Sequence, residues 1–209
     1  MLKVLIADDH VIVRKGLRQI LAEASGEFAV DEACNGQEAL EKAYKKTYDV
    51  ILMDIAMPGR SGLDILKQLK QEIPGIPVII LSVYSEEQYA VRAIKTGASA
   101  YLTKESAPEE LIKAIRKVSR GGKYVTASLA EKLASAIELD LEKLPHETLS
   151  NREYEILCMI ASGKTPTQIS GELSLSVKTI STYRTRILRK IGMSNNAELT
   201  HYAIKNNLV

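Results

Sequence analysis

The sequence has no tryptophan, a single phenylalanine and only two cysteines among its 209 residues. Leucine, isoleucine, valine and alanine must therefore fill the interior, and a hydrophobic fraction of 45% suffices for one large core or two modest ones. The cysteines, Cys34 and Cys158, lie far apart and lack the spacing of a metal-binding motif. This favours two free thiols over a disulfide or a redox pair.

Long apolar runs are also missing. No run approaches the roughly 18 residues that a membrane span needs. The N-terminal stretch MLKVLIADDH lacks the charged start, apolar middle and small-residue cleavage site of a secretory leader. We therefore expect a cytoplasmic protein with no membrane partner.

The sequence has no large excess of positive or negative charge, since the net charge is +2. The charged residues are nevertheless distributed unevenly along the chain. Residues 1–120 hold 17 Lys and Arg against 17 Asp and Glu, whereas residues 149–209 hold 8 against 4. Residues 177–190 contain no acid and five cations, namely Lys178, Arg184, Arg186, Arg189 and Lys190. A basic stripe of this kind suits a polyphosphate partner.

The first 120 residues alternate short apolar runs with amphipathic helical patterns. The apolar runs predict five strands, at 3–7, 28–33, 50–53, 77–81 and 100–103. Capping pairs predict three of the helix starts, namely Asn35 with Glu38, Ser85 with Gln88 and Ser106 with Glu109. Strands that alternate with helices predict an α/β fold with a five-stranded, doubly wound parallel sheet.

Polar residues follow several of these strands. Asp8 and Asp9 come just past the first strand and Asp54 just past the third, while Ser82 ends the fourth and Lys104 follows the fifth. In an open parallel sheet, ligands bind outside the carboxyl ends of the strands. We therefore expect these five side chains to converge on one edge of the sheet.

The three acids predict a particular chemistry. Carboxylates this close repel one another, and a hard divalent cation such as Mg²⁺ relieves that repulsion while leaving positions open for phosphate oxygens. Asp54 would attack a phosphoryl group and become an acyl phosphate, with Lys104 holding its charge and Ser82 donating a hydrogen bond. The simpler interpretation is three surface acids neutralised by a lysine, which the joint placement at four strand ends disfavours.

The segments LIADDH, LMDIAMPG, IILS and AYLTK resemble, in order and approximate spacing, the receiver domains of two-component response regulators, over residues 1–120. The resemblance implies a flavodoxin-like fold in which Asp54 is the phosphoacceptor. It also implies that Asp8, Asp9 and Asp54, with the backbone carbonyl of Ala56, hold Mg²⁺. It gives His10 no role, and we interpret His10 as a polar residue that opens the first helix.

The same resemblance implies that Ser82 and Lys104 contact the phosphoryl group. Tyr101 matches the aromatic residue that such domains turn inward when the serine moves; the alternative interpretation is a half-buried tyrosine at a strand end. Two positions depart from the common pattern. Glu105 follows the lysine where many receivers have proline, and Val83 is bulkier than the small residue often found after the serine.

Residues 121–148 are predicted to form a linker, with a helix over residues 127–141. From residue 149 onward only helical patterns occur. Thr165 is predicted to cap a short helix and Ser176 a longer one, to about Ile191, with a tight turn between them, and Ser194 to open the last helix. This arrangement predicts a small all-α helix-turn-helix domain over residues 149–209.

The segments LSNRE, SVKTIS and RILRKIG resemble a LuxR-type helix-turn-helix, and with the receiver the whole chain resembles NarL/FixJ-type response regulators. Asn196 stands where arginine is frequent, and Tyr183 where histidine is common. The implied partner is double-stranded promoter DNA, contacted in the major groove by Ser181, Thr182 and Thr185. Side chains that would contact the DNA backbone are Lys178, Thr179, Tyr183, Arg184, Arg186 and Lys190; any one of these charges could instead lie on a solvated helix face.

The resemblance implies a non-enzymatic transcription regulator. A sensor histidine kinase would phosphorylate Asp54, and the change at the segment 83–96 would alter homodimerisation and promoter binding, with RNA polymerase as a further partner. The last helix, with Ala197, His201 and Ile204, is either a dimer contact or part of the core. Two alternatives are a phosphorylation-independent DNA-binding regulator and an aspartyl-phosphate phosphatase. Ala56 disfavours the phosphatase, because such enzymes often have a second aspartate there.

Overall fold

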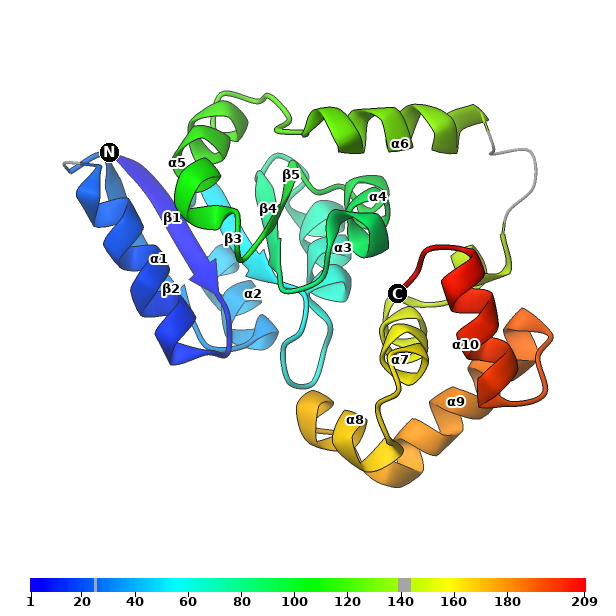
Figure 1. Ribbon diagram of the computed structural model, residues 1–209. Helices are drawn as coiled ribbons and strands as arrows, with labels where there is room; N and C mark the ends of the chain where they lie inside the picture. Colours follow the sequence, from blue (N-terminus) through cyan, green and yellow to red (C-terminus); the bar gives the residue numbers. More distant parts are fainter. Residues whose placement is uncertain (25, 139–143) are drawn as a thin grey trace. The chain divides into compact units, whose positions relative to one another are not determined.

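We describe a computed structural model that covers residues 1–24, 26–138 and 144–209 (Figure 1). The chain forms two compact units, Met1–Ala130 and Glu131–Val209, which are treated separately below. Within the described ranges, no helix has the length and apolar character that crossing a membrane requires.

The N-terminal unit is built on a parallel sheet with the strand order β2-β1-β3-β4-β5. Its strands are β1 (Leu2–Ala7), β2 (Phe28–Ala33), β3 (Val50–Asp54), β4 (Val78–Ser82) and β5 (Ala100–Thr103). This confirms the predicted fold class. One detail differs from the prediction. The sequence pattern places Asp54 just past this strand, but it is the last residue of β3. Every residue of β3 and β4 is buried, which explains why both strands appear in the sequence as continuous apolar runs.

Helices cover both faces of this sheet (Figure 1). They are α1 (Val11–Glu23), α2 (Gly36–Lys45), α3 (Gly62–Glu72), α4 (Glu86–Thr96) and α5 (Ala107–Val118), and α6 (Ala127–Glu138) follows them in the chain. Alternate strand residues such as Val4 and Leu52 form one core cluster with Leu17 of α1 and Leu111 of α5. Intervening residues such as Met53 are buried too, as expected of a doubly covered sheet. Of the predicted helix 127–141, the last three residues lie outside the described ones.

The three predicted helix starts are confirmed, but only one of the three predicted side-chain caps forms. The Asn35 side chain accepts a hydrogen bond of 2.9 Å from the amide of Glu38, as predicted. Ser85 and Ser106 precede α4 and α5 but make no side-chain cap, so that part of the prediction is wrong. The Ser106 hydroxyl instead bonds Thr103, three residues earlier at the end of β5, so a different local contact replaces the predicted cap.

The C-terminal unit is entirely helical in its described residues. A 3₁₀ turn (Pro145–Thr148) leads into α7 (Asn151–Ala161), α8 (Pro166–Leu173), α9 (Val177–Ile191) and α10 (Asn196–Lys205). Thr165 and Ser176 cap α8 and α9 as predicted, each accepting a hydrogen bond from the amide three residues on. The last helix is capped by Asn195 and not by Ser194. The tight turn at Ser174 between α8 and α9 completes a helix-turn-helix.

The start of α3 is packed closely against the end of β3. The amide of Gly62 donates a 2.9 Å hydrogen bond to the carbonyl of Ile55. A Cβ atom at Gly62 would lie 1.8 Å from the carbonyl oxygen of Asp54, which is a backbone atom. Residue 62 must therefore be glycine for the loop 55–61 to fold back beside Asp54.

We predict that Gly62→Ala lowers the free energy of unfolding of the N-terminal unit by about 1–3 kcal/mol, since the added methyl overpacks against fixed backbone. The matched control is Gly16→Ala in α1, where nothing lies within 4 Å of the added carbon. That control should stabilise the helix by up to ~1 kcal/mol. Chemical denaturation followed by circular dichroism measures both changes, and equal effects would contradict the prediction.

Candidate phosphoacceptor site and nucleic-acid interface

The predicted acids and the predicted lysine come together at the carboxyl edge of the sheet. Lys104 Nζ lies 2.8 Å from Asp54 Oδ2 and 2.7 Å from Asp8 Oδ2, so one ammonium group bridges two carboxylates. Asp8 and Asp54 are 1% and 2% exposed. Asp9 is only partly buried and completes the acidic side of the site.

Burial dominates the electrostatics of Asp54. It raises the pKa of the Asp54 carboxyl to about 6, with Asp8 adding to the rise, whereas Lys104 and the amide of Ala56 oppose it. Burial also disfavours the charge on Lys104, but the attraction of Asp54 and Asp8 is stronger, and the pKa of Lys104 is raised. Near neutral pH the site therefore contains a buried carboxylate that is stabilised mainly by one lysine.

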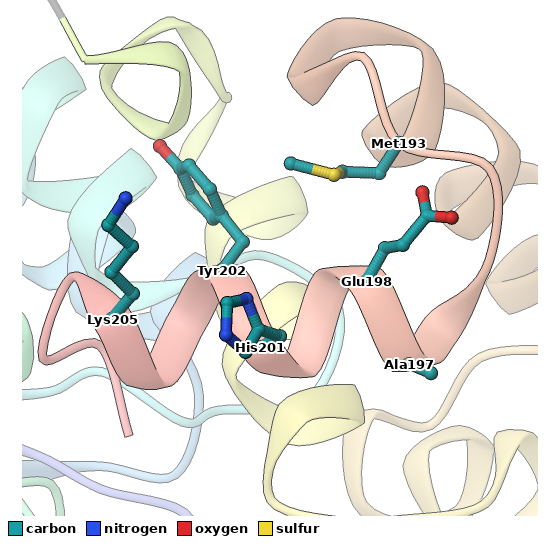
Figure 2. A pocket seen from close by; sticks show the side chains of 6 residues that line it. All are labelled: Met193, Ala197, Glu198, His201, Tyr202 and Lys205. Carbon is teal, nitrogen blue, oxygen red and sulfur yellow. The ribbon is translucent and has the colours of Figure 1, made fainter.

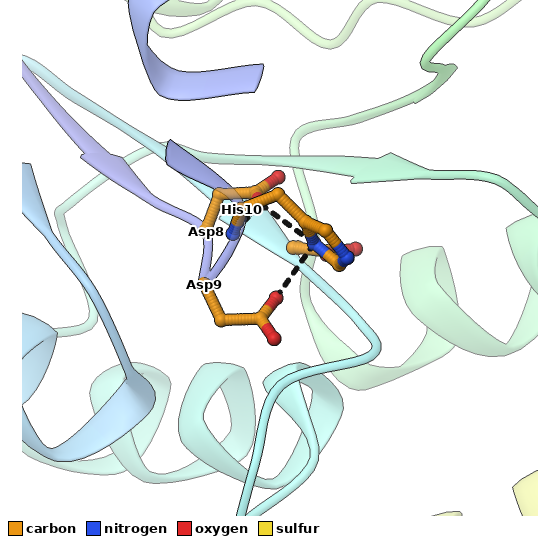
Figure 3. Close-up of side chains that lie close together, drawn as sticks. Asp8, Asp9 and His10 are labelled. Carbon is orange, nitrogen blue, oxygen red and sulfur yellow. Dashed lines mark hydrogen bonds and ion pairs between the residues drawn. The ribbon is translucent and has the colours of Figure 1, made fainter. Parts of the chain in front are cut away.

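The acidic side of this site could hold a metal ion. Asp8, Asp9, His10 and Asp54 each offer one ligand atom, and these atoms lie within 4.8 Å of one another. Asp8 Oδ2 and Asp9 Oδ1 are buried, and beyond the contacts with Lys104 Nζ at 2.7 Å and His10 Nδ1 at 2.9 Å neither accepts a hydrogen bond from the described residues. Buried carboxylate oxygens with so few donors around them are well suited to a hard cation. Figure 3 shows that His10, which sequence reasoning set aside, lies against both adjacent aspartates.

The remaining predicted residues lie in the loop after β3 and on β4 and β5. The amide of Ala56 donates a 3.3 Å hydrogen bond to Asp54 Oδ1. Ser82 is fully buried at the end of β4, and its hydroxyl accepts a 3.1 Å hydrogen bond from the amide of Tyr84. Tyr101 is buried as well, and its hydroxyl donates to the carbonyl of Tyr84 at 2.8 Å. Burial raises the pKa of the Tyr101 hydroxyl, which keeps it protonated and able to donate.

In the C-terminal unit, α9 presents the predicted groove residues to solvent. Ser181, Thr182 and Thr185 are exposed. Each hydroxyl donates a hydrogen bond of 3.0 to 3.1 Å to the carbonyl four residues earlier. The protons are thus directed at the helix, and the hydroxyl oxygens are left as acceptors on this face.

The basic residues of α9 differ in their surroundings. Lys178 and Arg186 are exposed. Lys190 Nζ lies 2.6 Å from Glu153 Oε2 of α7, so an acid distant in sequence offsets part of its charge. Arg184 donates from Nε to Asn196 Oδ1 at 2.5 Å. Thr179 and Tyr183, the other predicted backbone contacts, are half-buried on the same helix.

Two family models match this chain. Residues 4–116 match the response regulator receiver domain, and residues 147–203 match the bacterial regulatory proteins of the LuxR family. The chain belongs to the two-component response regulators. It is a DNA-binding response regulator that joins a receiver to a LuxR-type helix-turn-helix, as the sequence motifs imply.

Full-length relatives support this assignment. This chain is 37% identical over 209 residues to the response regulator UvrY of Escherichia coli strain K12, and the match covers 100% of this chain and 96% of UvrY. It is also 37% identical over 210 residues to the response regulator GacA of Pseudomonas aeruginosa, with coverage of 100% and 98%.

Solved structures agree. The response regulator RcsB of Salmonella typhimurium is similar with a TM-score of 0.61 at 27% identity, over 97% of this chain and 98% of that one. A structure of an RcsB–DNA complex is similar with a TM-score of 0.59 at 28% identity, over 96% of both chains. Both comparisons confirm the order of the two folds in this response regulator.

We predict that Asp54→Asn stabilises the metal-free protein by up to about 3 kcal/mol above pH 7, because a carboxyl pKa raised from 3.8 to about 6 corresponds to roughly that free energy. The folded-state pKa of about 6 lies above the usual 3.8, so folding favours the protonated acid. The advantage of Asp54→Asn should therefore shrink as the pH falls from about 6 toward 4. Denaturation of both forms in chelator across this range measures the difference, and a pH-independent difference would contradict the raised pKa.

We predict that Lys178→Ala weakens binding to promoter DNA and lowers the slope of log affinity against log salt by about 1, as loss of one phosphate contact does. Lys190→Ala should change the slope less, because Glu153 already offsets part of its charge, and should instead lower the stability of the C-terminal unit. Fluorescence anisotropy at several salt concentrations and thermal unfolding separate the two effects. Equal slopes for the two variants would be evidence against this division.

Proposed function

We propose that a sensor histidine kinase phosphorylates Asp54 and thereby controls how this response regulator binds promoter DNA. The observation that carries the proposal is the buried Asp54 carboxylate, which is held 2.8 Å from Lys104 at the edge where parallel sheets bind ligands. A carboxylate this buried, beside one cation and two further acids, suits covalent chemistry better than surface charge pairing.

In the proposed transfer, an Asp54 carboxylate oxygen attacks the phosphorus of the donor phosphohistidine. The new bond joins that oxygen to phosphorus, and the phosphorus–nitrogen bond breaks with its electrons passing to the imidazole of the kinase. Asp8, Asp9, Asp54 and the carbonyl of Ala56 would hold Mg²⁺, which supplies charge neutralisation when bound. Lys104 then pairs with the phosphoryl oxygens and relaxes its contact with Asp54.

The proposed switch runs through Ser82 and Tyr101. Donation of the Ser82 hydroxyl to a phosphoryl oxygen would draw the end of β4 toward Asp54. Tyr84 would follow, since its amide already donates to Ser82, and its carbonyl is held by Tyr101. The surface of residues 83–96, which includes α4, would then favour a second arrangement.

On the DNA side we propose a homodimer that uses α9 in the major groove. RcsB structures exist with promoter DNA in the presence of the phosphomimetic BeF₃⁻, and with two dimers on two DNAs. By analogy, Ser181, Thr182 and Thr185 would contact bases. Contacts to phosphates and sugars would come from Lys178, Thr179, Tyr183, Arg184, Arg186 and Lys190. The domain division is proposed as 1–120, 121–148 and 149–209, and the role as regulatory and not enzymatic.

The proposal is tested by intact mass spectrometry after incubation with acetyl phosphate and Mg²⁺. The native chain should gain one phosphoryl mass that hydroxylamine removes, because an acyl phosphate is labile to it. Asp54→Asn, which keeps the shape of the side chain, should gain none. DNA binding of the two forms should differ after the same treatment.

Failure of the native chain to label, under conditions that label another receiver, would overturn the phosphorylation step. The DNA-binding unit would then be tested without phosphate. Labelling of Asp54→Asn at the native level would move the modification to another residue.

A further inference from the structure

His10 sits in the acidic cluster and has no part in the proposed phosphoryl transfer. Its ring nitrogen Nδ1 lies 2.9 Å from Asp9 Oδ1 and 3.3 Å from Asp8 Oδ1. Its backbone amide donates a 2.8 Å hydrogen bond to Asp8 Oδ1, which fixes where the side chain begins. Figure 3 shows the contacts of the His10 ring with the two aspartates.

Few donors face these carboxylate oxygens. Among the described residues, Asp9 Oδ1 has its close contact with His10 Nδ1 at 2.9 Å, and the almost fully buried Asp8 Oδ2 has its close contact with Lys104 Nζ at 2.7 Å. Neither oxygen accepts a further hydrogen bond from these residues. The carboxylate oxygens of Asp8 and Asp9 and the ring nitrogen of His10 therefore surround one point, and their lone pairs could be directed at an ion placed there.

The spacing fits a single ion. The four ligand atoms, one each from Asp8, Asp9, His10 and Asp54, lie within 4.8 Å of one another. Ligands on opposite sides of an ion with bonds of about 2.2 Å are separated by about 4.4 Å, so side-chain shifts of a few tenths of an ångström would bring all four into contact. The side chain of His10 is 63% exposed, and its ring can make such a shift without disturbing the core.

We propose that His10 is an inner-sphere nitrogen ligand of this metal site and gives the site a preference for a first-row transition ion over Mg²⁺. The inference rests on the metal site of the proposed function, but not on phosphorylation. An all-oxygen site suits Mg²⁺, which keeps several waters. Replacing one water by imidazole favours borderline ions such as Ni²⁺ and Zn²⁺, because affinity for nitrogen rises along the first transition row.

The selectivity experiment measures the affinities of the full-length chain for Ni²⁺ and Mg²⁺ by isothermal titration calorimetry. His10→Gln should weaken Ni²⁺ binding by tenfold or more, while Mg²⁺ binding changes by less than twofold. His201→Gln is the matched control, because His201 is exposed on α10 (Figure 2), and this substitution should leave both affinities unchanged. Asp9→Asn should weaken both ions, which places the measured binding in this cluster.

A second readout detects the ligand itself. Pulsed electron paramagnetic resonance of the Mn²⁺-loaded chain should show coupling to an imidazole ¹⁴N nucleus, and His10→Gln should remove it. Absence of that coupling in the native chain, or equal loss of Mg²⁺ and Ni²⁺ affinity in His10→Gln, would overturn the inference. In either case His10 only neighbours the acids, and phosphorylation of Asp54 is judged by its own labelling experiment.

Discussion

The contact of one lysine with two buried carboxylates is the constraint around which the receiver unit is organised. Lys104 Nζ reaches both Asp8 and Asp54, which are nearly inaccessible to water. Removing such charges from water costs several kcal/mol per ion, and only close pairing offsets that cost. A lysine whose backbone were shifted along β5 would leave the two acids uncompensated. The length and register of β5 are thus tied to the electrostatics of the site.

The rest of the N-terminal fold serves to fix these positions. Asp54 is the last residue of a buried central strand and pairs with Leu81 of β4, which restrains its backbone. Behind it, the loop after β3 returns so closely that Gly62 has no room for a side chain. A site assembled on strand ends and braced by close backbone packing keeps its groups in place before any ligand arrives.

Much of this could be predicted from sequence, for a definite reason. The period of the apolar runs gives the strands, and polar residues that end those runs in a parallel sheet must share an edge. This reasoning placed Asp8, Asp9, Asp54 and Lys104 together without coordinates. It could not give the contact of Lys104 with Asp8, because that depends on how far a flexible side chain extends. The position of the His10 ring likewise depends on a side-chain rotamer that spacing does not encode.

Sequence reasoning was weaker where a side chain has a competing partner, whether near or distant in the sequence. Thr165 caps α8 as predicted, because both hydrogen bonds of its capping box with Gln168 are local. Ser106 did not cap, since Thr103 offered its hydroxyl another partner. In α9, the absence of acids within residues 177–190 predicted a basic stripe of five cations. Glu153 lies outside those residues, however, and forms an ion pair with Lys190 between α7 and α9.

The segment after β4 shows how local chemistry at one edge could reach a surface. The two backbone groups of Tyr84 are divided between two partners, because its amide donates to Ser82 and its carbonyl accepts from Tyr101. The ring of Tyr84 also stacks on that of Tyr89 in α4, with centroids 4.8 Å apart. If the Ser82 hydroxyl gained a new acceptor, the resulting movement would therefore reach β5 and α4 through Tyr84. Because packed groups move between discrete arrangements and not continuously, this connection favours a two-state response.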